Sequence, residues 1–428
     1  MGAILIKNGR VIDPAAGLDR LADLLIQDGR IVRVGPSLAA PPGPVETIDA
    51  SDRIVAPGLI DMHVHFREPG SEHQETIASG SRAAVAGGFT TVCTMPNTDP
   101  CVDNEGSVAF VVRCGAQADQ AHVLPIGAMT VDRQGEQMAE LGQMVRAGAV
   151  AFSDDGSSVA DSGVLAKCMS YSRMFDTPYI SHAEDKSLAG SGVMHAGKVS
   201  ARLGLPGIPS ASEEIVIARD IMLAHMTGGK LHIAHISTAG SVELIRRAKA
   251  AGTPVTAEVT PHHLALTDEA VTSYDPVYKM NPPLRTAADV AALKAGLKDG
   301  TIDCIASDHA PHEREAKELE FLYAPFGVIG LESTLAIVIR ELIDSGLLSW
   351  SELIARMATH PARILGLPSG RLAEGAPADV TVIDPMRPWT IDSRTFLSKS
   401  RNCPFDGQKV RGKAVLTLVG GQIKYRQT

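Results

Sequence analysis

The chain of 428 residues carries 40 Lys and Arg against 49 Asp and Glu, a net charge of −9, and 44% of it is hydrophobic. No basic run stands out and only 4% of the residues are aromatic, which argues against a nucleic-acid partner or an anionic membrane surface. The six cysteines form no Cys-x-x-Cys pair, so a reducing cytoplasm fits better than a disulfide framework. Neither a signal peptide nor a membrane-spanning run is expected.

Both ends of the chain are predicted to be rich in short strands. Asn8-Gly9 and Asp28-Gly29 each lie between β-type apolar runs and predict hairpin turns, and Gly420-Gly421 predicts another near the other end. Similar patterns at the two ends favour one small β-sandwich domain, built from residues 1–56 together with residues 366–428.

Between these ends, strand and helix patterns alternate. Helical patterns such as residues 210–226 and 241–251 fall between most of the candidate strands. Because eight βα units close into a barrel more readily than they form an open sheet, residues 57–365 are predicted to fold as a (β/α)8 (TIM) barrel. The eight candidate strands are residues 58–65, 90–95, 123–128, 149–153, 179–182, 230–235, 255–258 and 303–307.

Histidine and aspartate stand at the ends of five of these apolar runs. Imidazole and carboxylate suit divalent zinc, and a barrel places its catalytic groups at the carboxyl ends of its strands. One open catalytic metal usually takes three protein ligands, so a larger set suffices for two metals if one carboxylate bridges them. The pattern therefore predicts a two-metal hydrolase with the candidate ligands His63, His65, Asp155, His182, His235 and Asp308.

Some of these ligands have rivals on the residues alone. His63 and His65 are two apart, so a strand would point both into the barrel mouth, unless they are simply packed core histidines. Asp155 is the candidate bridge, but Asp154 is its equal on chemistry, and Asp-Asp-Gly is also turn chemistry.

The second metal has a similar ambiguity. His182 and His235 each close an apolar run and together could hold it. His232 is a rival for His235, although it lies three residues earlier and is expected to face the helices.

The remaining candidates would act on the substrate. Asp308 ends the eighth predicted strand and is the natural general base, and afterwards the general acid to a leaving amine. Arg67 continues the inward face of the first strand, where a guanidinium suits a substrate carboxylate. Asn97 and Asn281 lie on strand-end loops, where each could contact substrate or be an ordinary turn residue. His312 could be a metal ligand, a substrate contact or a loop residue.

Four motifs together resemble the dihydroorotases of the long bacterial type (class I), in the amidohydrolase superfamily. They are Asp-Met-His-Val-His-Phe-Arg-Glu-Pro-Gly at 61–70, Met-Pro-Asn-Thr at 95–98, Met-Asn-Pro-Pro-Leu-Arg at 280–285 and Ser-Asp-His-Ala-Pro-His at 307–312. His-x-His alone identifies only the superfamily, whereas Arg67, Asn97 and Asn281 together are far more specific. The resemblance runs over essentially the whole chain.

The resemblance implies a role for each candidate residue and two Zn²⁺ per chain. It implies that His63, His65 and Asp308 hold one metal, that His182 and His235 hold the other, and that Asp155 rather than Asp154 bridges them. It also implies that dihydroorotate is held by Arg67, Asn97, Asn281 and His312 and by the backbone of Phe326 and Gly327. The implied reaction is reversible opening of dihydroorotate to N-carbamoyl-L-aspartate in pyrimidine synthesis, with Asp308 as the catalytic acid and base.

Two other functions compete with this one. A hydantoinase or allantoinase would bridge its metals with a carboxylated lysine, but no lysine follows the fourth predicted strand. A metal-free homologue that only supports an aspartate transcarbamoylase should have lost ligands, and this chain keeps the whole set. The resemblance leaves open whether an active enzyme here forms a homodimer or binds such a transcarbamoylase.

Overall fold

Eight short parallel strands form a barrel in the computed structural model, which describes residues 2–427. Neighbours along the chain are neighbours in the sheet, from β6 to β15. The ring closes where Val64 bridges His309 in parallel and the His65 N–H donates to the His309 carbonyl at 2.8 Å. The predicted barrel is confirmed, with a strand in each predicted place: β6 (Leu59–Val64), β7 (Phe89–Thr94), β8 (His122–Gly127), β9 (Ala151–Phe152), β10 (Tyr179–Ser181), β13 (Leu231–Ile233), β14 (Val255–Val259) and β15 (Cys304–Ile305).

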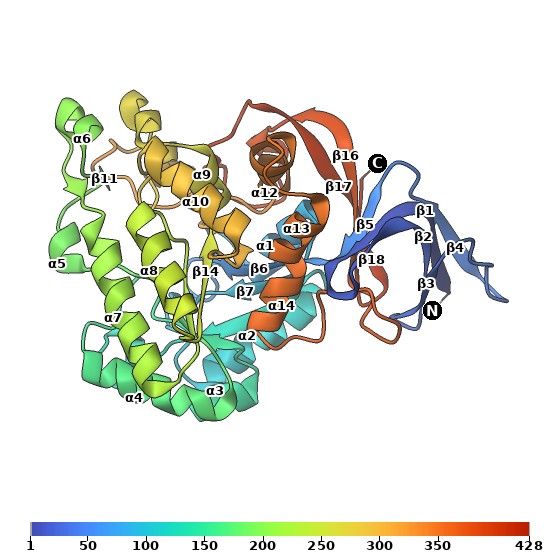
Figure 1. The fold of residues 1–428 in the computed structure, drawn as a ribbon, viewed down its shortest axis with the longest axis horizontal. Coiled ribbons are helices and arrows are strands. Elements are labelled where there is room, and N and C mark those ends of the chain that lie inside the picture. Colours follow the sequence, from blue (N-terminus) through green and yellow to red (C-terminus); the bar gives the residue numbers. More distant parts are fainter. Residues whose placement is uncertain (1, 428) are drawn as a thin grey trace.

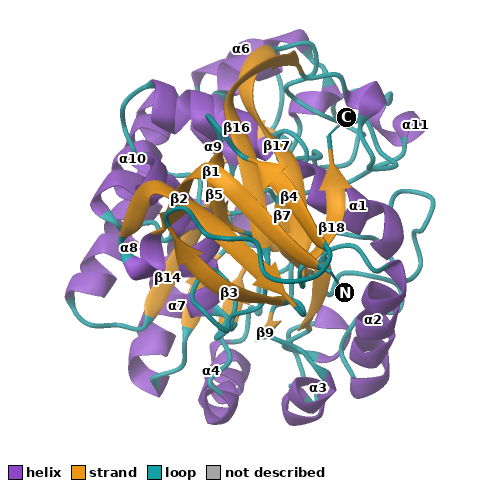
Figure 2. Ribbon diagram, turned by 90° about the vertical axis from the view of Figure 1, so that its right-hand side faces the viewer, coloured by secondary structure: helices purple, strands orange, loops and turns teal. Residues whose placement is uncertain are grey.

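Helices surround this barrel, as the purple ribbons at the edge of Figure 2 show. Capping residues in the sequence fix where two of them begin. Thr76 and Ser79 cap α1, and Thr286 and Asp289 cap α10; in each pair, the side chain of one residue accepts the backbone N–H of the other. The predicted helices at 210–226 and 241–251 appear as α7 and α8. The larger helices are α1 (Ile77–Gly87), α2 (Glu105–Ala118), α3 (Leu141–Ala147), α4 (Ser162–Ser172), α7 (Ala211–Thr227), α8 (Ala239–Ala250) and α10 (Ala287–Asp299).

Shorter elements decorate the loops and the return from the barrel. The strands β11 (Met194–His195) and β12 (Gly207–Ile208) pair with each other in parallel. α12 and α13 continue as π-helical segments at Ile339–Asp344 and Ala355–Thr359. The short helices are α5 (Lys186–Ala189), α6 (Lys198–Leu203), α9 (Pro261–Ala265), α11 (Arg314–Lys317), α12 (Thr334–Val338), α13 (Trp350–Ile354) and α14 (His360–Ile364).

A second eight-stranded sheet is built from both ends of the chain, as predicted, and lies beside the barrel (Figure 1). The two ends join where β5 pairs antiparallel with β16, with Val55 opposite Val382. The strands are β1 (Ala3–Asp13), β2 (Leu18–Gln27), β3 (Arg30–Gly35), β4 (Val45–Asp49), β5 (Ile54–Pro57), β16 (Val380–Thr390), β17 (Lys409–Val419) and β18 (Gln422–Arg426). The domain boundaries at 56/57 and 365/366 stay a prediction.

Two of the three predicted hairpin turns are confirmed and one is wrong. Asp28-Gly29 and Gly420-Gly421 turn the chain with positive φ at both residues, as tight hairpins require. Asn8-Gly9 instead lies inside β1 as an irregularity in its pairing with β2. The strand continues because it pairs with β2 on both sides of that point. Glycine is needed at position 9 for a different reason, since a Cβ there would lie 2.5 Å from Val55 Cγ2.

The interior of the barrel is packed below the site. Met62, Cys93, Ile126 and Ile180 form one buried cluster that also takes in Ile364 of α14. Functional side chains are therefore confined to the opposite, carboxyl-terminal mouth.

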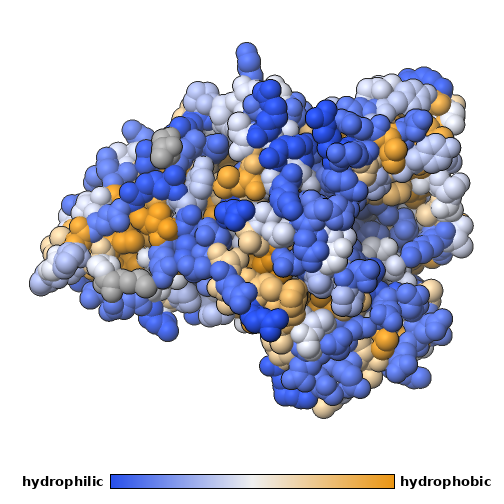
Figure 3. All heavy atoms as spheres, turned by 180° about the vertical axis from the view of Figure 1, so that it is seen from behind, coloured by the Kyte–Doolittle hydropathy of each residue, from blue (hydrophilic) through white to orange (hydrophobic). Residues whose placement is uncertain are grey.

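The outer surface shows no extended apolar face in the view of Figure 3, where hydrophobic side chains form small patches between hydrophilic ones. None of the helices within residues 2–427 has the length and hydrophobicity that crossing a bilayer requires.

Candidate metal centre and pocket

A cavity of about 270 Å³ opens at the carboxyl-terminal mouth of the barrel. The predicted site residues come together here, because every one of them except His63 lines the cavity, and His63 is fully buried. The lining is His65, Arg67, Asn97, Asp155, Gly156, His182, His235, Asn281, Asp308, Ala310, His312, Phe326 and Gly327. The chain therefore brings side chains from both halves of the barrel to one small polar pocket.

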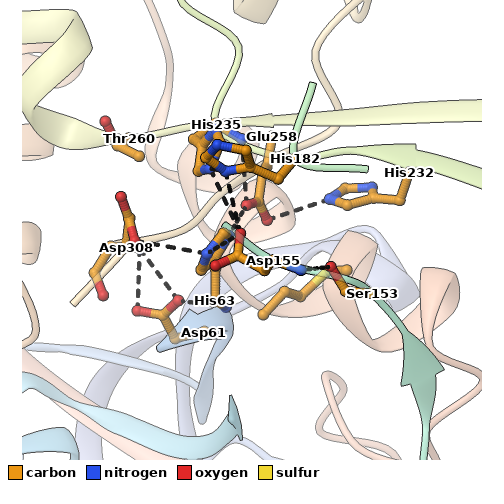
Figure 4. Close-up of polar contacts among 12 residues, drawn as sticks. Asp61, His63, Ser153, Asp155, His182, His232, His235, Glu258, Thr260 and Asp308 are labelled. Atoms are coloured by element: carbon orange, nitrogen blue, oxygen red, sulfur yellow. Dashed lines mark hydrogen bonds and ion pairs between the residues drawn. The ribbon is translucent and has the colours of Figure 1, made fainter. Parts of the chain in front are cut away.

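Asp155 lies at the centre of the imidazoles, as Figure 4 shows. Its Oδ1 is 3.4 Å from His63 Nε2, 3.3 Å from His182 Nδ1 and 3.9 Å from His235 Nε2. Its Oδ2 is 3.6 Å from His65 Nε2. One carboxylate thus contacts the histidines predicted for both metals, which is the geometry that a bridging ligand needs.

Asp308 completes a second cluster. Its Oδ1 is 3.2 Å from His65 Nε2 and 3.6 Å from His63 Nε2. Two overlapping groups of possible metal ligands result, His63 with His65 and Asp308, and His63 with Asp155 and His235. Burial alone raises the pKa of Asp308, but the imidazoles of His63, His65 and His235 outweigh it and hold the pKa below its usual range.

The unsatisfied atoms of this cluster fit divalent metal ions. His63 Nε2 and Asp155 Oδ1 are buried without a hydrogen-bond partner among the described residues, which is costly for polar atoms. His182 Nδ1 and His235 Nε2 lie only 3.0 Å apart, although ring nitrogens repel unless a proton or a cation lies between them. Imidazole and carboxylate donors at this density are the ligands of zinc and its neighbours.

Hydrogen bonds behind the ligands select their tautomers. His63 Nδ1–H donates to Glu258 Oε1 at 2.8 Å, and His65 Nδ1–H donates to Asn97 Oδ1 at 2.9 Å. Each bond leaves the Nε2 lone pair of its histidine directed at the cluster, as a metal ligand requires.

Glu258 supports the site through hydrogen bonds, and the sequence did not single it out. Its Oε2 also accepts from His232 Nε2 at 3.2 Å, and its Oε1 accepts the His235 backbone N–H at 3.4 Å. Burial raises its pKa, but His232 and His63 outweigh this and lower the pKa to about 2, so the group stays a carboxylate. One signal in the sequence could have identified Glu258. It ends the predicted strand 255–258, and the predicted strands before and after it end at or next to the candidate ligands His235 and Asp308.

The geometry separates Asp155 from Asp154. Asp154 Oδ1 accepts the backbone N–H groups of Met129 at 2.9 Å and Thr130 at 3.0 Å, and its Oδ2 accepts the Thr130 hydroxyl. Asp154 therefore fastens the loop after β8, while its neighbour faces the histidines.

The expected orientation of His232 is wrong. Its strand neighbours Leu231 and Ile233 pack in the cluster that contains Ile217 of α7, so His232 points the other way, into the barrel, where it reaches Glu258. His235 lies beyond the end of β13, and its φ of +29° turns it to the mouth. The prediction assumed that side chains alternate between the two faces of the strand up to His235, but the strand ends at Ile233.

Three site residues have left-handed backbone conformations. The φ angles are +59° at Arg67, +29° at His235 and +47° at Asp308. Such conformations cost about 1–3 kcal/mol each for residues with a Cβ, and they concentrate at functional sites where the surroundings impose them. The chain leaves its strands sharply at these points, which directs the side chains at the pocket.

The polar side of the pocket is formed by Arg67, Asn97, His312 and Asn281. Arg67 Nε donates to the Pro311 carbonyl at 3.2 Å, and no ion pair to Arg67 occurs within the described chain. His312 Nε2–H donates to the Phe326 carbonyl at 2.7 Å, and burial lowers the pKa of His312 to about 3, so its ring is neutral. A guanidinium without a carboxylate partner is thus placed beside the His and Asp cluster.

Comparison with known proteins places the chain in a family. Residues 52–241 match the model described as "Dihydro-orotase-like". The chain is 52% identical over 420 residues to a dihydroorotase of Pelotomaculum thermopropionicum, covering 98% of each chain. It is 51% identical over 424 residues to a dihydroorotase of Pelobacter propionicus, covering 99% of this chain and 100% of the relative.

A solved structure confirms the architecture. An L-hydantoinase (dihydropyrimidinase) from Arthrobacter aurescens matches with a TM-score of 0.90 at 27% identity, over 100% of this chain and 96% of the hydantoinase. Since half of the residues are shared with dihydroorotases over nearly the whole length, the chain belongs to the dihydroorotase family, as its motifs predicted.

Proposed function

We propose that the protein catalyses the reversible hydrolysis of (S)-dihydroorotate to N-carbamoyl-L-aspartate, a step of pyrimidine synthesis. The observation that carries the proposal is the half-buried Arg67 without a carboxylate partner among the described residues, in the same pocket as the His and Asp cluster. Dihydroorotate brings a carboxylate to such a guanidinium and a cyclic amide to such a cluster. Relatives named dihydroorotase at 52% and 51% identity support the same substrate.

The proposal includes two zinc ions per chain. His63, His65 and Asp308 would hold one, His182 and His235 the other, and Asp155 would lie between them. Bound zinc would supply Lewis acidity for the amide carbonyl and lower the pKa of water.

Asp308 is the proposed acid and base. It has a pKa below the usual carboxyl range, so it is ionised and able to accept the proton of the attacking water at neutral pH. It lines the pocket, and the protonated carboxyl can then deliver the proton to the ring nitrogen that leaves. The same group serves both directions of a reversible reaction.

The other lining residues orient the substrate in this proposal. Arg67 and Asn97 would hold the substrate carboxylate, and His312 and Asn281, with the Phe326 and Gly327 backbone, would hold the rest of dihydroorotate. Asn97 is already fixed by His65 and donates from Nδ2 to Asp155 Oδ2 at 3.3 Å. Its amide therefore couples the substrate side of the pocket to the metal side.

The wider setting is also proposed. Six free cysteines, five of them buried, support a reducing cytoplasm. A homodimer and an association with aspartate transcarbamoylase stay predictions from the resemblance.

The likeness to a hydantoinase structure makes other cyclic amides the second candidate. Zinc-loaded protein should therefore be assayed side by side with L-dihydroorotate, hydantoin and allantoin. We expect turnover of L-dihydroorotate at least about a hundredfold above the other two, because only it offers a carboxylate to Arg67. Preferred turnover of hydantoin or allantoin would overturn the proposed substrate while leaving the hydrolase site in place.

A further inference from the structure

One wall of the pocket is a surface segment, residues 313–327, that we call the pocket segment. Much of it is exposed, with Tyr323 at 73%, and it is anchored through the buried Phe321 and Ala324. It ends in Phe326 and Gly327, which line the cavity. A mostly exposed segment that forms a binding wall needs specific contacts to keep its shape.

Lys317 holds the inner side of this segment. Its ammonium donates to the carbonyls of Pro325 at 3.0 Å, Gly327 at 3.0 Å and Lys279 at 3.3 Å, which uses all three of its donors. No carboxylate forms an ion pair with Lys317 in the part of the chain that the structure describes. Burial, with Lys279 nearby, lowers its pKa to about 7. Hydrogen bonds to backbone carbonyls, and not an ion pair, therefore hold the Lys317 side chain in place.

Asn402 holds the same carbonyl from the other side. It comes from the stretch before β17, and its Nδ2 donates to Gly327 O and to Ala310 O, both at 3.1 Å. Its own carbonyl accepts the Ile329 N–H at 3.1 Å. The Gly327 carbonyl is thus bound by two donors that come from separate parts of the chain.

Gly327 occupies a position that only a glycine fits. Its N–H donates to Lys279 O at 3.0 Å and its φ is +132°. A Cβ there would lie 2.9 Å from His312 Nε2 and 2.9 Å from Ala310 Cβ. The backbone next to Gly327 is linked to the pocket, because His312 donates to the adjacent Phe326 carbonyl.

Lys279 reinforces the arrangement. It is buried, and its Nζ donates to the carbonyls of Phe321 at 2.8 Å and Leu322 at 3.0 Å. The same Nζ lies 4.8 Å from the centre of the Phe326 ring. Two lysines thus hold four carbonyls of the pocket segment.

We propose that Lys317 and Asn402 are positioning residues that clamp Gly327, so that substrate affinity depends on two side chains outside the pocket lining. The inference rests on the proposed function for the identity of the substrate. The clamp acts through the Phe326–Gly327 backbone and His312, which the proposed function assigns to binding rather than to proton transfer. Loss of the clamp should therefore raise KM and leave kcat nearly unchanged.

The test uses Lys317→Met, which removes the ammonium and keeps an unbranched chain, with Lys198→Met at an exposed lysine as the control. Zinc-loaded full-length proteins are compared by kinetics on L-dihydroorotate and by hydrogen exchange of residues 313–327. We expect KM to rise about tenfold with kcat within about twofold, and exchange in the pocket segment to quicken. The control should match the wild type in both.

Asn402→Ala provides an independent test should Lys317→Met fail to fold, and the same changes are expected. Unchanged KM together with unchanged exchange would overturn the clamp while the proposed function stands. A fall in kcat with KM unchanged would also overturn it. Wild-type protein that does not turn over dihydroorotate would reject the proposed function, and the exchange rates would still decide whether the segment is clamped.

Discussion

His63 Nδ1 lies 2.8 Å from Oε1 of Glu258, although 195 positions separate the two residues in the chain. This bond fixes the ring of a predicted metal ligand, and the same carboxylate holds His232 and the His235 backbone. The orientation of these candidate ligands thus depends on a residue that is not itself a predicted ligand.

Glu258→Gln is expected to weaken zinc binding about 10- to 100-fold, the usual effect of losing a ligand's hydrogen-bond partner. Competition with a chromophoric chelator measures the affinity. Glu136→Gln, at an exposed position, is the matched control and should bind zinc as the wild type does. Equal affinities for the Glu258 variant and the wild type would show that Glu258 does not orient His63.

Arg67→Ala is expected to raise KM for L-dihydroorotate about 10- to 100-fold, since a hydrogen bond to a charged group contributes about 1.5–3 kcal/mol. Steady-state kinetics measure this, with Arg82→Ala at an exposed position of α1 as the control. An unchanged KM would mean that Arg67 does not bind the substrate carboxylate.

Asp308→Asn is expected to lower kcat about 10²- to 10⁴-fold, because the amide can neither accept nor deliver the proton. Asp308 also lies in one of the two ligand groups, so metal content must be measured in the same samples. A variant with wild-type metal content and kcat within tenfold of the wild type would exclude Asp308 as the acid and base.

His263 predicts a pH dependence of stability. Its Nδ1 accepts from the Thr260 hydroxyl at 2.7 Å, its Nε2–H donates to the Pro282 carbonyl at 2.9 Å, and burial lowers its pKa to about 3. The folded protein therefore keeps this ring neutral between pH 6.5 and 3, where the unfolded chain binds a proton. Because the unfolded state binds more protons there, the free energy of unfolding falls as the pH falls below 6.5.

His263→Gln lacks this dependence. The difference in unfolding free energy between the wild type and the variant should shrink by about 2 kcal/mol from pH 7 to pH 5. Urea denaturation at pH 7 and pH 5 measures this change. Both proteins are first treated with a chelator, so that pH-dependent release of metal does not contribute to the result. A constant difference would show that His263 is protonated in the folded protein or does not titrate in this window.

Much of the barrel could be predicted because its strands are short apolar runs that end in polar ligands. Each of β6, β10 and β13 ends near the histidine that marked it in the sequence. The ligands share one pocket because parallel barrel strands end at one face. The Asn8-Gly9 turn was predicted wrongly because local turn propensity was outweighed by the pairing of β1 with β2 on both sides.

Contacts between distant segments could not be predicted. Glu258 and Asn402 act through hydrogen bonds to residues far away in the chain, and no spacing in the sequence encodes those partners. The Lys317 bond to Gly327 spans only ten positions, but it joins two ends of an irregular segment whose path the sequence pattern does not give. His232 was placed on the wrong face because the strand ends at Ile233, and His235, which is beyond it, has a left-handed backbone that turns its side chain to the mouth. Choosing Asp155 over Asp154 from the residues alone was equally impossible, since only the fold shows which of them Thr130 engages.

The most direct test of the two-metal dihydroorotase is to count zinc and measure hydrolysis of L-dihydroorotate in one sample of full-length protein. The account predicts turnover with close to two zinc ions per chain, lost on chelation and restored by zinc. Turnover that persists after complete removal of metal, or bound zinc without turnover of dihydroorotate, would contradict it.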